Sequence, residues 1–141
     1  MTATLIILIK DNKVLFLKRT QGWGAGTYSL PGGNVELHES LSQACIRESN
    51  EELGITINPA DLQFVTMLHI KNFCMNVCME YILVTFVASN WEGEIYNKEP
   101  EKHSELAWFD LNNLPENLAP FARETLKAYQ SKQTFAEYGW Q

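Results

Sequence analysis

The chain has 141 residues and a mass of 16.1 kDa, and 45% of its residues are hydrophobic, including the 11% that are aromatic. This is enough apolar material for one domain, residues 1–141, with its own core, which excludes a disordered or fibrous protein. Only 11 basic residues face 17 acidic ones, for a formal net charge of −6, so binding to the phosphate backbone of a nucleic acid is not expected.

The cysteines and the apolar segments favour a cytoplasmic protein. Cys45, Cys74 and Cys78 are odd in number and lie in apolar sequence, which argues against the disulfide framework of a small secreted protein. The apolar start at residues 4–9 has no basic leader and no small-residue cleavage site, so we expect a buried strand rather than a signal peptide. No later segment reaches membrane-spanning length, and we expect no membrane association.

The hydrophobic pattern along the chain predicts a mixed α/β domain. Strands are expected at residues 2–9, 14–19, 62–70, 77–88 and 106–109, and helices at residues 40–53 and 121–130. The polar residues 10–13 suit a hairpin turn, and the glycine-dense loop at residues 21–27 excludes a helix there. Strands and helices do not alternate regularly, which argues against a doubly wound fold.

The helix at residues 40–53 carries signals for both of its ends. Ser40 is a good N-cap residue, and Gln43, three residues later, completes a capping box. Gly54 follows the last helical residue, where a left-handed residue commonly ends a helix. These local signals predict the two ends of the helix before its surroundings are known.

The glutamates of this helix continue an apolar stripe. At the helical period one stripe of roughly 120° holds Leu41, Ala44, Cys45, Glu48, Glu51 and Glu52. Glu48 and Glu52 form a like-charge pair four residues apart, and both lie near the unfavourable end of the helix dipole. These penalties suggest a counter-ion, and carboxylate oxygens suit Mg²⁺ or Mn²⁺, with no His or Cys joining them to favour zinc. An ordinary acidic helix end that pairs with surface lysines is the alternative.

The glutamates also belong to a longer pattern. The chain resembles the Nudix hydrolases, whose box reads G-x5-E-x7-R-E-U-x-E-E-x-G-U with U a bulky aliphatic residue, because it contains Gly33-x5-Glu39-x7-Arg47-Glu48-Ser49-x-Glu51-Glu52-x-Gly54-Ile55. The one departure is Ser49, at an aliphatic position that packs the helix against the sheet. Similar segments before and after the box point to MutT-like members. The resemblance implies their α/β/α sandwich, a mixed β-sheet flanked by helices.

The resemblance also implies a set of site residues. The metal ligands would be Glu48, Glu51 and Glu52, with the carbonyl of Gly32 and one further glutamate from a loop outside the box. That loop acid is Glu101 or Glu105, of which we take Glu101. Arg47 and Glu39 would be partners that orient the ligands, and Glu52 or the loop acid would act as the base. The implied catalytic set is therefore Glu39, Arg47, Glu51 and Glu52.

Contacts with a substrate are predicted at four positions. Arg19 closes a strand just before the glycine-rich loop and could meet phosphates, and Gly33 lies in the turn next to the helix. Tyr28 and Phe73 could stack on a base, as could Trp23 and Trp108, although aromatic residues in and beside strands are more often part of a core. We assign no role to His38, His69 or His103, because they show no ligand spacing.

The function that the resemblance favours is Mg²⁺-dependent hydrolysis of a nucleoside triphosphate, oxidised or noncanonical nucleotides included, to a monophosphate and pyrophosphate. Relatives that act on sugar nucleotides usually carry an additional N-terminal segment, whereas this chain begins with its first strand. Two alternatives stay open: a hydrolase of sugar nucleotides or dinucleoside polyphosphates, and a nucleotide-binding module without catalysis. The expected partner is a small-molecule nucleotide, and the protein is expected to be a monomer or a homodimer.

Overall fold

The computed structural model describes residues 1–22, 24–74 and 77–140, and the side chains of residues 72–78 lie outside this description. Its elements, in chain order, are β1 (Thr2–Lys10), β2 (Lys13–Arg19), β3 (Tyr28–Ser29), β4 (Gly32–Asn34), α1 (Leu41–Leu53), the short 3₁₀ helix η1 (Pro59–Asp61), β5 (Gln63–Cys74), β6 (Val77–Ala88), β7 (His103–Asp110), α2 (Pro120–Ser131) and β8 (Phe135–Tyr138).

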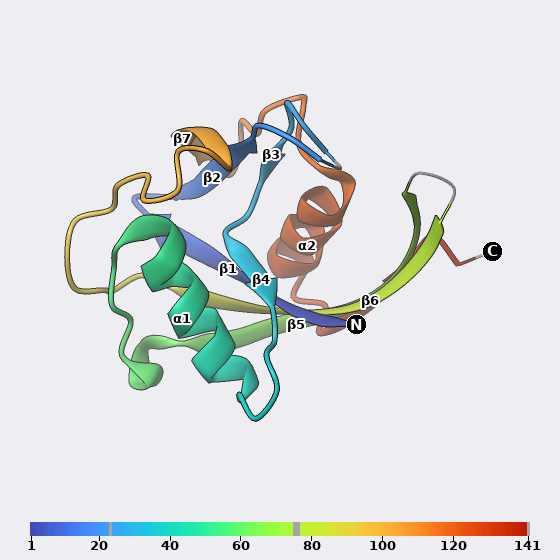
Figure 1. Ribbon diagram of the computed structural model, residues 1–141, viewed down its shortest axis with the longest axis horizontal. Coiled ribbons are helices and arrows are strands. Elements are labelled where there is room, and N and C mark those ends of the chain that lie inside the picture. Colours follow the sequence, from blue (N-terminus) through green and yellow to red (C-terminus); the bar gives the residue numbers. More distant parts are fainter. Residues whose placement is uncertain (23, 75–76, 141) are drawn as a thin grey trace.

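The strands form a mixed sheet. Its order is β3-β2-β1-β6-β5-β8, while β4 pairs with β1 and β7 pairs with β2. The pairs β1–β6 and β5–β8 are parallel, and the other pairs are antiparallel. The two helices lie on different sides of the long strands (Figure 1). This α/β sandwich is the architecture that the resemblance implied.

Strand β1 lies between two hydrophobic clusters because its side chains alternate between the faces of the sheet. Leu5 and Ile7 pack in the cluster that contains α2, and Ile6 and Leu8 pack in the cluster that contains α1. All four are at least 95% buried. A strand buried on both faces reads as a continuous apolar run rather than an alternating one.

The ends of α1 are as predicted, but its buried face is rotated. The Ser40 capping box is present, and Gly54 ends the helix in the left-handed region at φ 71°. The buried residues of the helix are Ala44, Cys45, Ser49, Glu52 and Leu53, whereas Leu41 is exposed. Ser49 is tolerated in this packed position because its hydroxyl donates a hydrogen bond to the carbonyl oxygen of Cys45 at 2.8 Å.

The strands of the second half of the chain differ from the predicted ones in extent. β5 runs on to Cys74, β7 begins at His103, and β8 was not predicted. Because β8 pairs with β5 at the edge of the sheet, and its residues alternate between exposed and half-buried, it has no strong hydrophobic signal of its own. Among the described residues, no helix is long and apolar enough to cross a membrane.

Candidate active site

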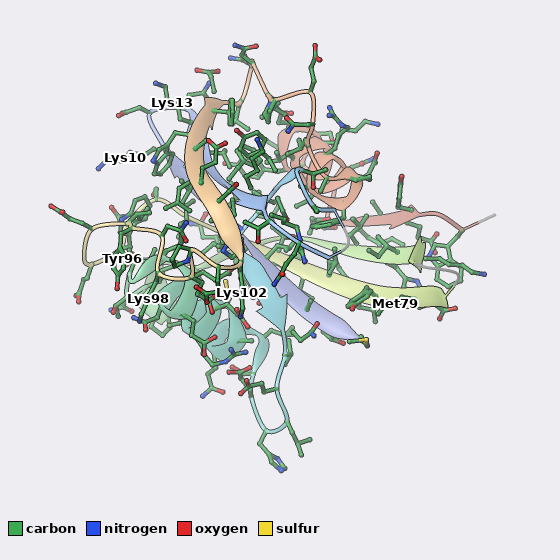
Figure 2. The ribbon with its side chains drawn as sticks, turned by 45° about the horizontal axis from the view of Figure 1, so that its top comes forward. Lys10, Lys13, Met79, Tyr96, Lys98 and Lys102 are labelled. Atoms are coloured by element: carbon green, nitrogen blue, oxygen red, sulfur yellow. The ribbon has the colours of Figure 1, made fainter. Side chains whose placement is uncertain are left out.

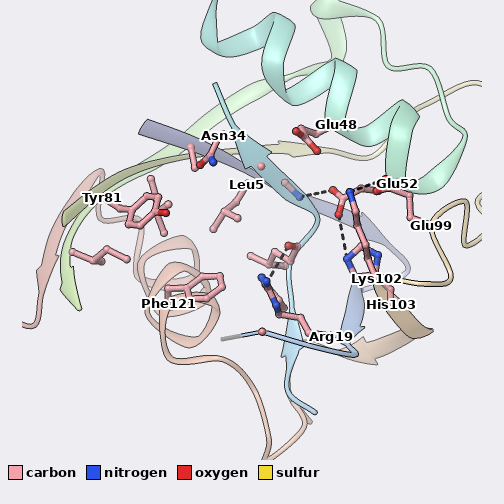
Figure 3. A pocket seen from close by; sticks show the side chains of 18 of the residues that line it. Leu5, Arg19, Asn34, Glu48, Glu52, Tyr81, Glu99, Lys102, His103 and Phe121 are labelled. Carbon is pink, nitrogen blue, oxygen red and sulfur yellow. Dashed lines mark hydrogen bonds and ion pairs between the residues drawn. The ribbon is translucent and has the colours of Figure 1, made fainter. Parts of the chain in front are cut away.

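A cavity of about 660 Å³ lies beside the C-terminal half of α1. At one end it is lined by Glu48, Glu52, Glu99 and His103, and toward the other end by Tyr81 and Phe121. Figure 3 shows the acidic end and the apolar end as separate parts of one site. The volume is typical of a pocket for a small organic ligand, and the division suits a molecule with one charged and one apolar part.

Glu52 is a buried carboxyl at the acidic end, with 6% of its surface exposed. Its Oε1 accepts a hydrogen bond from the backbone N–H of Gly32 at 2.8 Å, and its Oε2 lies 3.4 Å from Nε2 of His103. Burial raises the pKa of Glu52 to about 8; the charges of Glu48 and Glu99 add to the rise, and the Gly32 bond and the charge of Lys102 oppose it. The ionised form of Glu52 therefore needs a cation beside it.

The two glycines before α1 allow the strand β4 to approach its neighbours closely. A Cβ atom on Gly32 would collide with the carbonyl oxygen of Thr4 on β1, and one on Gly33 would collide with the carboxylate of Glu48. Position 32 therefore needs the smallest residue, because its neighbour is backbone, whereas at position 33 a side chain would displace the Glu48 carboxylate. The close approach at Gly32 and Gly33 lets the Gly32 N–H donate a hydrogen bond to Glu52, and it leaves room for the Glu48 carboxylate.

Arg47 holds the acids on the outer side of the helix. Its Nε and one terminal nitrogen bind both oxygens of Glu39 at 2.6 and 3.1 Å, and its other terminal nitrogen binds Glu48 at 2.9 Å and Glu51 at 3.2 Å. It also donates to the backbone carbonyl of Asn34 at 3.0 Å. The bidentate bond to Arg47 lowers the pKa of Glu39. The structure thus brings together the residues predicted to orient the ligands.

The two remaining box glutamates differ in burial. The side chain of Glu48 is 16% exposed, and burial raises its pKa although Arg47 opposes the shift. The side chain of Glu51 is 50% exposed and contacts Arg47. Glu51 was expected on the same stripe as Glu52, but the rotation of α1 turns it toward solvent, and it does not line the cavity.

The acids are not neutralised by surface lysines. Within the described part of the chain, the ion pairs of Glu48 and Glu51 are with Arg47. Lys98 donates to the backbone carbonyl of Asn50 at 3.4 Å, and Lys102 pairs with Glu99, which is not on the helix, while Lys10 and Lys13 lie well away (Figure 2). An ordinary acidic helix end paired with lysines is therefore not what the structure has.

The loop acid that reaches the site is Glu99 rather than Glu101 or Glu105. Ligand atoms of Glu52, Glu99 and His103 all lie within 4.8 Å of one another. The side chain of Glu101 is exposed and does not line the cavity. Glu105 lies on β7 with its carboxylate 3.6 Å from Lys18.

Neither Glu99 nor His103 was assigned from the sequence. The backbone N–H of His103 donates to the carbonyl oxygen of Glu99 at 3.1 Å, so one turn places the two residues on the same side. The spacing Glu-x3-His just before a strand is the signal that could have found them. Burial lowers the pKa of His103, which favours its neutral form with a free lone pair.

Some of the residues predicted to contact a substrate line the cavity, and others do not. Arg19 and Gly33 line the cavity. Tyr28 is not among the residues that line it: β3 pairs with β2, and the ring of Tyr28 packs in the core, where its centroid lies 5.1 Å from that of Phe109. The side chain of Phe73, like residue Trp23, lies outside the described part of the structure.

Trp108, another aromatic residue proposed to stack on a base, lies outside the cavity. The rings of Trp108 and Trp91 stack with centroids 6.4 Å apart, and Trp108 does not line the cavity. Among the described side chains, the aromatic residues that do line it are Tyr81 and Phe121, from β6 and α2. These two were not proposed from the sequence, because only the packing of distant elements brings them to the same pocket.

Comparison with known proteins identifies the family and agrees with the fold. The NUDIX domain model matches residues 1–129, and the chain belongs to the Nudix hydrolase family. Over 109 residues, or 77% of the chain, it is 34% identical to an uncharacterised Nudix hydrolase, YvcI, of Bacillus subtilis, and 35% identical to an ADP-ribose pyrophosphatase of Methanocaldococcus jannaschii. The chain spans 65% and 61% of the lengths of these two relatives.

Relatives and structures of the MutT type are similar to the same degree. An 8-oxo-dGTP diphosphatase of Buchnera aphidicola is 34% identical over 109 residues, which cover 77% of this chain and 75% of that protein. The crystal structure of a MutT NUDIX hydrolase from Burkholderia pseudomallei superposes with a TM-score of 0.82 at 28% identity, covering 90% of this chain and 95% of that one. The similarity therefore extends over nearly the whole domain.

Proposed function

We propose that this chain is a Mg²⁺-dependent pyrophosphohydrolase that cleaves a nucleoside triphosphate, oxidised or noncanonical ones included, to a monophosphate and pyrophosphate. The observation that carries the proposal is the buried carboxyl of Glu52, grouped with Glu48 and Glu99 at one end of a cavity of about 660 Å³. An acidic pocket repels a polyphosphate unless a cation lies between the two.

The residues at the acidic end fit a divalent cation. Glu48, Glu52 and Glu99 offer the hard oxygen ligands that Mg²⁺ and Mn²⁺ prefer. Because burial and acidic neighbours raise the pKa of Glu52 to about 8, the described residues do not by themselves stabilise its charge. Bound metal would offset the charge of the diphosphate and lower the pKa of the attacking water.

The chain's own residues orient these groups and move the proton. The Gly32 N–H holds one oxygen of Glu52, and Arg47 holds one oxygen of Glu48. With one oxygen fixed, the other oxygen of each carboxylate has a defined direction. Glu52 is the residue that we assign as acceptor of the proton of the attacking water, since its carboxylate lies beside the site of the diphosphate.

The rest of the cavity suits a nucleoside. Tyr81 and Phe121 offer aromatic faces at the apolar end, and Arg19 offers a guanidinium for phosphate oxygens between the two ends (Figure 3). A nucleotide bound in this direction would place its base against the aromatic residues and its phosphates against the acids. This direction is part of the proposal.

A second candidate is hydrolysis of a sugar nucleotide such as ADP-ribose. It is favoured by the relative from Methanocaldococcus jannaschii, which is as similar to this chain as the 8-oxo-dGTP diphosphatase. Both substrates contain the diphosphate that the acidic end would hold. A nucleotide-binding module without catalysis is disfavoured, because the box glutamates and Arg47 are all present and connected.

A substrate panel tests the proposal. The purified protein is incubated with 8-oxo-dGTP, the ordinary nucleoside triphosphates, ADP-ribose and dinucleoside polyphosphates, each with Mg²⁺, with EDTA, and with EDTA followed by excess Mg²⁺. We expect pyrophosphate and a monophosphate from a triphosphate, no products with EDTA, and recovery with added Mg²⁺. Release of phosphosugar from ADP-ribose alone would establish the second candidate, and turnover that persists in EDTA would contradict the metal requirement.

A further inference from the structure

His103 is a buried imidazole that its protein neighbours do not satisfy. Its side chain is 11% exposed and lines the cavity. The Nδ1 atom is buried and has no hydrogen-bond partner among the described residues. The Nε2 atom lies 3.4 Å from Oε2 of Glu52, beyond the usual range of a nitrogen–oxygen hydrogen bond. A buried polar ring with no good hydrogen bond needs another explanation, and a ligand is one.

The neighbours of His103 have the geometry of a cation site. Ligand atoms of Glu52, Glu99 and His103 lie within 4.8 Å of one another. Two atoms bound to the same ion at about 2.1 Å each lie at most about 4.2 Å apart. The three side chains therefore have to close on one another to share one ion, a movement that rotation about side-chain bonds supplies.

The present partner of Glu99 does not block such a site. Its Oε2 lies 3.0 Å from Nζ of Lys102, whose side chain is 59% exposed. Ion pairs with exposed lysines are weak, so a divalent cation would displace this one at little cost. Lys102 itself is on the loop side of the cavity (Figure 3) and is free to turn toward a bound anion.

We infer that His103 is a direct ligand of the divalent cation in this chain and completes, with Glu52 and Glu99, a mixed nitrogen and oxygen site. The inference rests on the proposed function, because it concerns the same acidic end of the cavity. Imidazole binds Mn²⁺, Co²⁺ and Zn²⁺ better than Mg²⁺, which prefers oxygen ligands. The site is therefore expected to favour Mn²⁺ over Mg²⁺ more strongly than carboxylates alone would.

A different role for His103 is to position Glu52 without touching the metal. In that role the imidazole would contact the carboxylate, as it does in the structure, and the ion would have oxygen ligands only. Loss of activity in a His103 variant fits both roles. The deciding observation is the presence or absence of nitrogen bonded to the ion, which activity does not report.

Electron spin echo envelope modulation of bound Mn²⁺ makes this observation. The intact protein is loaded with less than one equivalent of Mn²⁺ without substrate, and the same is done with His103→Phe, His103→Gln and the control His38→Asn, whose exposed side chain lies outside the cavity. We expect ¹⁴N modulation from the wild type and from His38→Asn, and none from either His103 variant. Modulation that is absent from the wild type, or that survives in both His103 variants, overturns the inference.

Binding affinities give a second readout. We expect the Kd for Mn²⁺ to rise about 10-fold or more in His103→Phe, and the Kd for Mg²⁺ to rise less than about 3-fold. Equal changes for the two ions would overturn the predicted selectivity. Should neither His103 variant fold, ¹⁵N-histidine labelling of a His38→Asn, His69→Gln double variant leaves His103 as the one labelled imidazole, and an unchanged spectrum on labelling then overturns the inference.

The two proposals fail separately. A protein that hydrolyses triphosphates with Mg²⁺ but shows no nitrogen on bound Mn²⁺ would keep its proposed function and lose the imidazole ligand. A protein with nitrogen on bound Mn²⁺ that hydrolyses none of the nucleotides would keep the site and lose the proposed function. Neither result depends on the other, because the spectrum is recorded without substrate.

Discussion

The glutamates around α1 form two regions with opposite electrostatics. On the outer side, Glu39 and Glu51 contact Arg47, whose hydrogen bond lowers the pKa of Glu39. On the inner side, Glu52 contacts a backbone N–H and an imidazole whose own pKa is lowered, and burial raises the pKa of Glu52 to about 8. The same residue type in the same turn of helix therefore has two electrostatic states.

This difference in electrostatics separates the acids that orient the site from the acids that bind the cation. The outer acids have their counter-ion within the chain, so this region is complete in the absence of a ligand. The inner acids are destabilised by burial and by one another, and they are stabilised when a cation binds. Glu48 lies between the regions, since Arg47 binds one of its oxygens while its carboxylate lines the cavity.

The largest effect is expected from a substitution in the inner region that replaces a single oxygen atom. We expect Glu52→Gln to reduce kcat by about 1,000-fold or more, because it removes both the charge and the proton acceptor. We expect Glu51→Gln to reduce kcat by about 10-fold or less, because Glu51 is half-exposed and acts through Arg47. Turnover is measured on the best triphosphate of the panel with saturating Mg²⁺, and thermal unfolding checks that both variants fold. Equal losses in the two variants would remove the distinction between the two regions.

The parts of the fold that were predicted correctly carry local signals. Ser40, Gln43 and Gly54 mark the ends of α1 by side-chain and backbone preferences that do not depend on tertiary contacts. The strand β8 could not be predicted in this way. Residues 135–138 become a strand because they pair in parallel with Met67–Ile70, about half the chain away in sequence, and a single short edge strand has little signal without its partner.

The site residues could also be predicted only where the sequence signal is local. The box spacing alone predicts that Glu48 and Glu52 act together, since both lie on one short helix. Glu99 and His103 reach the site through the loop before β7, whose path depends on the register of β7 against β2. The core position of Tyr28 could not be predicted, because an aromatic residue beside a glycine-rich loop looks the same in sequence whether it faces a core or a cavity.

A smaller effect is expected where the two regions meet, at Gly33. The methyl group of Gly33→Ala would collide with the carboxylate of Glu48, which is the flexible end of a side chain and can move away. We expect kcat to fall about 10- to 100-fold because Glu48 is displaced, while the free energy of unfolding changes little.

The matched control is Gly93→Ala, at a positive φ of 93° outside the cavity. Backbone strain there should lower the free energy of unfolding by about 1 kcal/mol and leave kcat unchanged. Urea unfolding and turnover, measured on both variants, should therefore show opposite patterns. A Gly33→Ala enzyme with normal turnover would show that the position of Glu48 is not critical.

The smallest expected effect is on stability, and it has a defined sign. The pKa of Glu52 is about 8 in the folded protein against an ordinary value of 4.5, so between these pH values the folded state holds a proton that the unfolded state has released. The stability of the metal-free protein should therefore fall as pH rises through this window. The amide introduced by Glu52→Gln does not titrate, so this variant should be more stable than the wild type at pH 8 and should lose this advantage near pH 5.

Urea unfolding in EDTA at pH 5, 6.5 and 8 measures this difference, with Glu116→Gln as the control because Glu116 is exposed and outside the cavity. Saturating Mn²⁺ should reverse the order at pH 8, because a ligand that binds only the folded state stabilises it, and Glu52→Gln binds the ion less well. If the free energies of unfolding of Glu52→Gln and the wild type differ by the same amount at all three pH values, Glu52 is not the carboxyl whose pKa is raised in the folded protein. In that case the carboxyl with the raised pKa would have to be sought at Glu48, whose burial also raises its pKa but whose contact with Arg47 opposes the rise.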